Sequence, residues 1–268
     1  MLTAFFGLPL LMIVGVSFFD YDGVSSVPAF QFGNYVDLFT SANTYALYLK
    51  TLEYALIVWA ITLVIGFTVS YFLAFHVRSL LWQMALFLLC TVPFWTSNII
   101  RMISWIPFLG RNGVFNQALV GLGITREPLE FLLFSDFAVI IAYVHLFTLF
   151  MIVPIFNAMA RIDRSIIEAA LDGGSSRLRV IWEIVVPLSK TGIALGSIFV
   201  ITLVMGDFFA VNTMSGGHSA SVALAMYNQI AAVQHPPAAA SAVVLLIIVV
   251  LMVAAILRLV DVRRELAG

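Results

Sequence analysis

The sequence predicts an all-α membrane protein with six transmembrane helices, and three observations support this fold class. Hydrophobic residues make up 62% of the 268 residues and charged residues only 10%, whereas about a quarter of an ordinary soluble domain is charged. So few charged side chains cannot cover the core of a soluble chain of this length. Long apolar runs recur along the chain, and those of its 17 glycines and nine prolines that lie within the runs are tolerated in helices that pack in a membrane.

Six apolar runs are close to the roughly 20 residues that a helix needs to cross a bilayer. The first begins almost at Met1, without a basic leader or a small-residue cleavage site, so we expect a membrane helix rather than a cleaved signal peptide. Between the runs, turn residues and charges indicate connecting segments. The predicted spans are residues 3–19, 52–75, 80–100, 136–157, 190–211 and 237–259.

The distribution of Lys and Arg predicts that both termini are cytoplasmic, because cytoplasmic loops are enriched in these residues. In this orientation four basic residues lie outside: Lys50, Arg101, Arg111 and Arg126. Nine lie inside, four of them in one loop between the fourth and fifth spans: Arg78, Arg161, Arg164, Arg177, Arg179, Lys190, Arg258, Arg263 and Arg264.

Other classes of function receive little support from the composition. A net charge of -1 argues against a nucleic-acid-binding surface. The single cysteine, Cys90, excludes an intramolecular disulfide. The four histidines are far apart, and no GxxxxGK[ST] motif for nucleotide binding occurs. We therefore expect neither a metal nor a nucleotide site in this chain.

The loop between the fourth and fifth predicted spans reads "RIDRSIIEAALDGGSSRLRVIWEIVVPLSKTG". Asp163 or Ser165 is suited to cap a short helix that ends at the glycine pair 173–174. Ser175 and Ser176 are suited to cap a second helix, which Pro187 should end or kink. The pattern predicts two helices joined by a glycine turn at the membrane surface. Glu168 has two interpretations, a surface pair with Arg164 at i-4 or a contact with a basic partner.

This loop resembles the "EAA" signature of the permease subunits of bacterial binding-protein-dependent ABC importers. The signature residues present are Glu168, Ala169, Ala170, Gly174, Ile184 and Pro187, all at the spacing of that family. Val186 stands where the family pattern has Leu. The loop also lies before the penultimate predicted span, as it does in the family.

The resemblance implies a single transmembrane domain over residues 1–268 with the type I ABC importer (MetI-like) permease fold. Residues 160–188 would form a cytoplasmic coupling loop that docks on a separate ATPase. It implies a transporter subunit rather than an enzyme, without a cofactor of its own, because ATP is bound by the partner. The implied partners are two ATPase subunits, a second homologous permease and a periplasmic substrate-binding protein, in a bacterial inner membrane.

From about Asn34 onward the chain looks like the spermidine/putrescine type of permease. The segments "RMISWIPFLGRNGVFNQAL" and "GDFFAVNTMSGG" carry this resemblance. It implies the import of polyamines by alternating access. Other members of the wider group carry thiamine, ferric iron, phosphonates or opines, so these cargoes remain alternatives, and an ATP-independent secondary transporter is a further rival.

Three residues are candidates for a polyamine pathway. Asp207 lies about 15 residues after Gly192, or roughly 22 Å along a helix, and a carboxylate at that depth favours a cavity and a cationic ligand. The alternative is an acid that caps a helix end. Trp105 and Tyr143 offer aromatic faces to an alkylammonium group, and the alternative for both rings is ordinary packing at the membrane interface.

Overall fold

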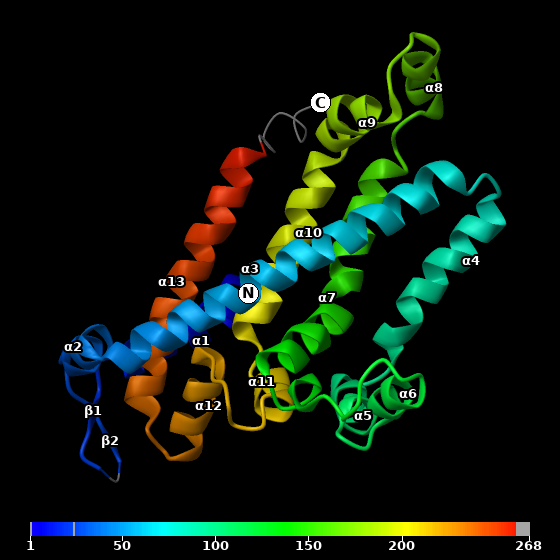
Figure 1. The fold of residues 1–268 in the computed structure, drawn as a ribbon. Helices are drawn as coiled ribbons and strands as arrows, with labels where there is room; N and C mark the ends of the chain where they lie inside the picture. The colour runs from blue at the N-terminus through cyan, green and yellow to red at the C-terminus, as the bar shows by residue number, and fades with distance from the viewer. Residues whose placement is uncertain (1, 24, 261–268) are drawn as a thin grey trace. The chain divides into compact units, whose positions relative to one another are not determined.

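The computed structural model describes residues 2–23 and 25–260 of the chain. Arg263 and Arg264, which the orientation argument counts, lie outside the described residues. Apart from a two-stranded hairpin, the regular elements in the described ranges are helical (Figure 1), which confirms the all-α fold class. The elements before the coupling loop are α1 (Leu2–Val16), β1 (Asp20–Tyr21), β2 (Ser26–Val27), α2 (Gly33–Thr40), α3 (Ala42–Tyr71), η1 (Phe72–His76), α4 (Leu80–Thr91), η2 (Val92–Trp95), α5 (Asn98–Leu109), α6 (Val114–Gly121), η3 (Glu130–Leu132) and α7 (Asp136–Met159). The remaining elements are α8 (Arg164–Asp172), α9 (Arg177–Val180), η4 (Ile181–Val185), α10 (Val186–Gly206), α11 (Phe209–Met214), α12 (Val222–Ala231) and α13 (His235–Leu259).

Four helical segments of the described chain are long and apolar enough to cross a membrane. They are Ala42–His76, Glu130–Met159, Arg177–Gly206 and His235–Leu259. A bent pair of helices supplies a fifth span if the two are counted together, and a shorter apolar helix, Gly7–Val16, corresponds to the first predicted span. All six predicted runs are largely helical, but three of them, 3–19, 80–100 and 190–211, are not single full-length helices, and the described residues supply four or five full-length spans.

The third predicted span, residues 80–100, is not one helix as the sequence predicted. Leu80–Trp95 and Asn98–Gly121 meet at an angle of 88°. Thr96, between them, has an extended backbone with φ -93° and ψ 148°. Proline lacks a backbone N–H, and Pro93 in the tight turn η2 begins the irregular backbone that leads to this break.

The fifth predicted span begins earlier than residue 190, because the helix before Pro187, which the sequence predicted to end or kink there, continues into it. Residues Arg177–Gly206 form one helical segment in which the wider π-type turn η4 ends two residues before Pro187. A proline in a helix leaves a backbone carbonyl without its N–H partner and crowds the preceding turn, and π-type turns accommodate such disturbances within a helix. The second part of the predicted coupling loop, residues 177–188, is thus the start of a segment long and apolar enough to span a membrane.

The described residues group into two compact units along the chain. One comprises Met1–Ala55, Trp105–Val139 and Val204–Met252, and the other Leu56–Ser104, Ile140–Leu203 and Val253–Gly268. In the first unit, polar groups join helices: the Tyr48 hydroxyl donates to the Ser241 carbonyl at 2.9 Å, and the Val222 N–H donates to the Thr51 hydroxyl at 3.0 Å. Interhelical hydrogen bonds of this kind hold helices together in lipid.

The second unit is built on close packing of α10 against α7. A Cβ placed on Gly192 would lie 2.4 Å from the Pro154 carbonyl oxygen, and one on Gly196 would lie 2.7 Å from Met151 Sδ. These glycines form a G-x-x-x-G pattern, which lets two membrane helices approach until their backbones touch. The Trp59 indole N–H adds a hydrogen bond from α3 to the Ser197 hydroxyl of α10 at 2.8 Å.

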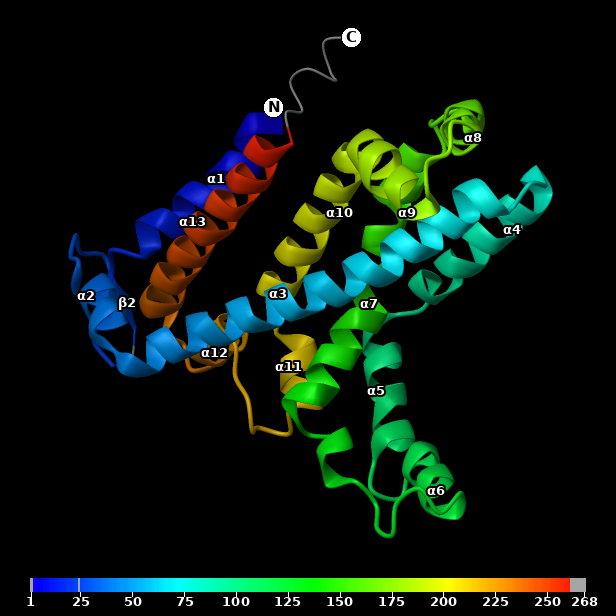
Figure 2. The same cartoon turned by 45° about the horizontal axis from the view of Figure 1, so that its top comes forward.

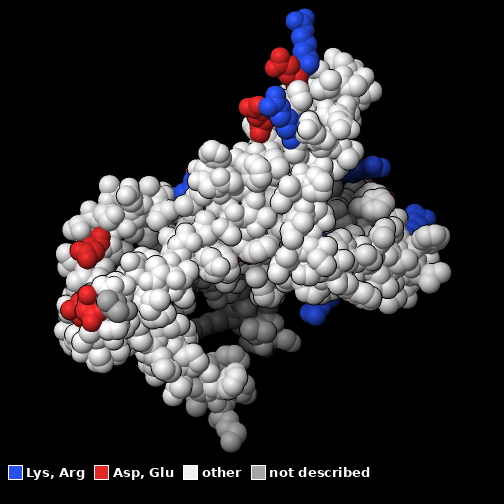
Figure 3. All heavy atoms as spheres, turned by 90° about the horizontal axis from the view of Figure 1, so that it is seen from below, with Lys and Arg blue, Asp and Glu red and all other residues white. Residues whose placement is uncertain are grey.

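The outer surface is suited to lipid. A wide area of the face in Figure 3 carries no Lys, Arg, Asp or Glu side chain. Large apolar side chains are exposed on the helices that are long and apolar enough to cross a membrane. Among them are Val64, Leu195, Phe199 and Leu251. Because water is a poor solvent for so much apolar surface, these observations agree with a multi-pass membrane protein.

Candidate functional site

Helix α8 carries the start of the coupling signature, and its first turn is fixed by a side-chain cap. Asp163 is the N-cap residue, and its carboxylate accepts a hydrogen bond from the Ser165 N–H at 2.9 Å. This hydrogen bond holds the pKa of Asp163 below its ordinary value, because it stabilises the charged form. The sequence left Asp163 and Ser165 open as caps, and the structure assigns the role to Asp163.

The end of α8 is the predicted glycine turn. Gly174 has φ +85°, a left-handed conformation that residues with a Cβ rarely adopt. The N–H groups of Gly174 and Ser175 bond back to the carbonyls of Leu171 and Ala170 at 2.9 and 3.0 Å, so they satisfy the last carbonyls of the helix. Ser176 then caps α9, since its hydroxyl accepts from the Arg179 N–H.

The structure separates the signature residues into two groups. Glu168 and Ala169 are exposed and Ala170 is half-buried on α8, which has no buried residue. Ile184 is half-buried in η4 and Pro187 is exposed at the start of α10. Figures 1 and 2 show α8 set off from the adjacent ends of α7 and α10. The signature therefore lies on a helix without buried residues and on the first part of a segment long enough to span a membrane.

Glu168 and Arg164 do not form the i-4 ion pair that the sequence left open. Among the described ion pairs, neither residue has a partner of opposite charge. The Arg164 Nη2 instead donates to the carbonyl oxygens of Ala74 and Val77, at 2.8 Å each. Glu168 is exposed on α8, and its contact with a basic partner stays a prediction.

Pockets lie on both sides of α8. One, of about 760 Å³, is lined by the end of α7, the start of α10 and the α8 residue Ile166. The other, of about 310 Å³, lies between α8 and the end of α3 and is lined by Glu168, Arg78 and Arg177 among others. Helix α8 is therefore loosely packed within its unit.

The three candidate cargo residues lie on different elements. Asp207 follows α10, and its carboxylate accepts a hydrogen bond from the Ala210 N–H at 2.8 Å, which is the helix-capping alternative. Trp105, in α5, packs edge-on against Phe108 with ring centroids 5.6 Å apart. Tyr143, in α7, is 1% exposed and stacks on Phe147, so its ring is enclosed by protein in this conformation.

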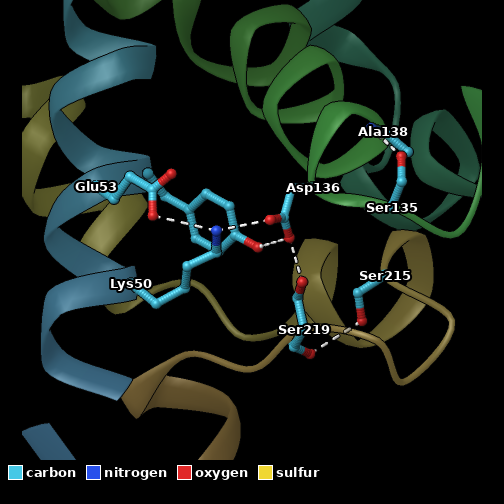
Figure 4. A network of polar contacts seen from close by, with 8 residues as sticks. Lys50, Glu53, Ser135, Asp136, Ala138, Ser215 and Ser219 are labelled. Atoms are coloured by element: carbon cyan, nitrogen blue, oxygen red, sulfur yellow. Dashed lines mark hydrogen bonds and ion pairs between the residues drawn. The ribbon is translucent and has the colours of Figure 1, made fainter. Parts of the chain in front are cut away.

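A polar network that the sequence did not predict joins α3, α7 and the loop before α12 (Figure 4). Lys50 Nζ lies 2.6 Å from Asp136 Oδ2 and 3.1 Å from Glu53 Oε2. The hydroxyls of Tyr54 and Ser219 both donate to Asp136 Oδ1, that of Tyr54 at 2.6 Å. The Lys50 ammonium also lies 5.1 Å from the centre of the Tyr54 ring, within cation–π range. In this network two carboxylates and an aromatic ring surround the ammonium group of the Lys50 side chain.

Curated proteins similar to this chain are bacterial permeases. The spermidine/putrescine transport system permease protein PotB of Escherichia coli K12 is 36% identical over 219 residues, which cover 80% of this chain and 77% of that protein. PotB of Haemophilus influenzae is 31% identical over 212 residues, covering 78% of this chain and 72% of that protein. The inner membrane ABC transporter permease protein YdcU of E. coli K12 is 28% identical and covers 84% of this chain.

Solved structures share the fold at low sequence identity. A bacterial ABC transporter involved in the import of alginate aligns with a TM-score of 0.75 at 15% identity, over 96% of this chain and 90% of that chain. An alginate ABC transporter in complex with a pentasaccharide-bound periplasmic protein aligns with a TM-score of 0.68 over 84% of this chain and 81% of that chain. No family model matches the sequence. The identity and coverage shared with the curated permeases confirm the resemblance, and the chain belongs to the PotB family of spermidine/putrescine transport system permease proteins.

Proposed function

We propose that this chain is the permease subunit of an ATP-driven importer of polyamines, and that α8 is the helix through which a separate ATPase drives it. One observation carries the proposal: the Glu168-Ala169-Ala170 segment lies on an α8 without buried residues, at the end of two packed membrane helices. An amphipathic helix with nothing buried against it is suited to a groove on another protein.

The proposed assembly has two ATPase subunits, a second related permease and a periplasmic binding protein. One of the structural neighbours was solved as a transporter with a periplasmic protein bound, which supports the last of these partners. Alternating access then requires that the movement of α8 is transmitted to the membrane helices before and after it in the chain. The continuous segment Arg177–Gly206 is suited to this, because it begins shortly after the glycine turn and continues through most of the apolar run 190–211.

The proposed orientation puts α8 in the cytoplasm and the Lys50–Asp136 network on the outer side. The excess of Lys and Arg in the loop that contains α8 supports it. The polyamine assignment is supported by the names of the curated relatives. Asp207, half-buried between α10 and α11, is the candidate carboxylate for the cargo, and Trp105 is the more accessible of the two candidate rings.

The cargo is tested by uptake of labelled spermidine in cells with and without the chain, in the presence of the other transporter subunits. Unlabelled putrescine, thiamine, ferric citrate and a phosphonate serve as competitors. We expect uptake that depends on the chain and is inhibited by putrescine alone among these four. Chain-dependent uptake of a different competitor, with no spermidine uptake, would overturn the polyamine assignment and leave the permease role standing.

A further inference from the structure

Helix α8 is flanked by pockets of about 760 and 310 Å³ and buries none of its side chains. A helix held so loosely transmits a push poorly, because movement is absorbed where few packed atoms resist it. If α8 is the coupling helix, its contacts with membrane helices determine which of those helices move with it. Arg164, in its first turn, makes such a contact.

The position of Arg164 is unfavourable for its own helix. A cation in the first turn of a helix opposes the positive end of the helix dipole. The same guanidinium lies at the carboxyl end of the α3–η1 segment, where the dipole favours a cation and the last carbonyls lack intrahelical partners. Arg164 Nη2 donates to two of these carbonyls, those of Ala74 and Val77, at 2.8 Å each. Arg164 therefore stabilises the carboxyl end of the α3–η1 segment rather than the start of α8.

Of the two acceptors, Ala74 lies in the core of the unit and Val77 is half-buried. Ala74 is 4% exposed and the preceding Leu73 is 2% exposed. A second side chain caps the same helix end: Gln83 Nε2, from α4, donates to the Leu73 carbonyl at 2.8 Å. Two side chains thus bond to the end of the α3–η1 segment: Gln83 from α4 and Arg164 from α8.

From this geometry we infer that Arg164 is a positioning residue that transmits the movement of α8 to the end of the membrane helix α3. The inference rests on the proposed function. A push on α8 reaches two membrane helices by different routes: the covalent route through the glycine turn to Arg177–Gly206, and the hydrogen-bonded route through Arg164 to Ala42–His76. Without the second route, ATP hydrolysis should continue while α3 responds weakly.

The test uses the whole transporter in proteoliposomes and measures cargo imported and ATP hydrolysed by the same preparation. Arg164→Met keeps the length of the side chain and removes its charge and donors. Loss of a hydrogen bond to a charged group changes an equilibrium by about tenfold or more, so we expect cargo imported per ATP to fall by about that factor. Arg164→Lys keeps a charged donor and should restore part of the ratio.

Gln83→Ala is the matched control, because it removes the other cap from the same helix end without touching α8. It should lower the amount of assembled transporter without changing the cargo-to-ATP ratio. If Arg164 only stabilised the fold, uptake and hydrolysis would fall together in Arg164→Met and the ratio would equal that of the wild type, which would overturn the inference. Absence of ATP-dependent uptake in the wild type would instead reject the proposed function.

Discussion

Gly192 in α10 touches the backbone of α7 at Pro154: a Cβ on Gly192 would lie 2.4 Å from the Pro154 carbonyl oxygen. Real Cβ atoms do not approach a carbonyl oxygen so closely, and the Pro154 carbonyl is part of the backbone, so it cannot rotate away. The pattern Gly192-x-x-x-Gly196 therefore fixes the distance between the helices on either side of the coupling loop.

We predict that Gly192→Ala forces α10 away from α7 and destabilises the protein by about 1–3 kcal/mol, the usual range for overpacking. Gly206→Ala, in the same helix, is the control, since a Cβ there meets nothing within 4 Å. Thermal unfolding in detergent should show a lower midpoint for Gly192→Ala alone. Equal midpoints for the two variants would contradict the close packing of α7 and α10.

The Lys50–Asp136 ion pair should contribute measurably to stability. Its side chains are 27% and 43% exposed, and hydroxyls of Tyr54 and Ser219 hold the carboxylate in place. A double-mutant cycle with Lys50→Met and Asp136→Asn should give a coupling energy of about 1 kcal/mol. The control cycle is the Arg179–Glu183 pair, whose side chains are 64% and 59% exposed, with an expected coupling of about 0.5 kcal/mol or less. A smaller coupling for Lys50–Asp136 than for the control would remove the structural role assigned to the network.

Glu168→Lys and Gly174→Asp should leave membrane insertion intact and abolish uptake. Glu168 is exposed, so reversal of its charge should alter the surface proposed to bind the ATPase rather than the fold. Gly174 has φ +85°, and a Cβ in this left-handed conformation costs about 1 kcal/mol, so Gly174→Asp distorts the turn after α8. The measurements are the amount of protein in the membrane and the rate of labelled spermidine uptake.

Two controls make this result specific. Asp172→Lys reverses another exposed acid of α8, and Gly121→Ala alters a glycine with an ordinary φ and free space around it. Both should transport normally. Wild-type uptake by Glu168→Lys and Gly174→Asp would show that α8 is not the coupling helix.

Asp207 caps a helix and is also the proposed counter-ion for the cargo, and substitution can separate the two roles. Its carboxylate accepts the Ala210 N–H, and an asparagine side chain retains such an acceptor while losing the charge. Asp207→Asn should therefore leave thermal stability unchanged and raise the KM for spermidine uptake several-fold, because the counter-ion is lost. Asp207→Ala should lower stability as well. A KM equal to that of the wild type in Asp207→Asn would leave Asp207 as a helix cap only.

Features encoded by neighbouring residues were predictable from the sequence. The apolar run 136–157 became α7, Asp136–Met159, and the capped helix with its left-handed glycine became α8 and Gly174. The break at Thr96 was missed because proline and apolar residues also occur in continuous spans. The helical segment from Arg177 to Gly206 was missed because the fifth span was predicted to begin at residue 190, after a helix that Pro187 was expected to end or kink.

Contacts between distant parts of the chain were not predictable from one sequence. Arg164 and its acceptor Ala74 are 90 positions apart, so the nearer Glu168 was the only partner that spacing suggested. Tyr54 and Asp136 are 82 positions apart, and nothing local marks them as partners. The Gly192–Gly196 pattern is the exception, because a G-x-x-x-G pattern in an apolar run is a recognised packing signal that was present in the sequence.

The most direct test of the account is uptake of labelled spermidine into proteoliposomes that contain this chain and the second permease, with and without the ATPase subunits, with loaded binding protein on one side and ATP on the other. The account predicts accumulation only when the ATPase and hydrolysable ATP are present, and none for Gly174→Asp. Accumulation of equal rate without the ATPase would contradict it, because a permease that works alone is a secondary transporter.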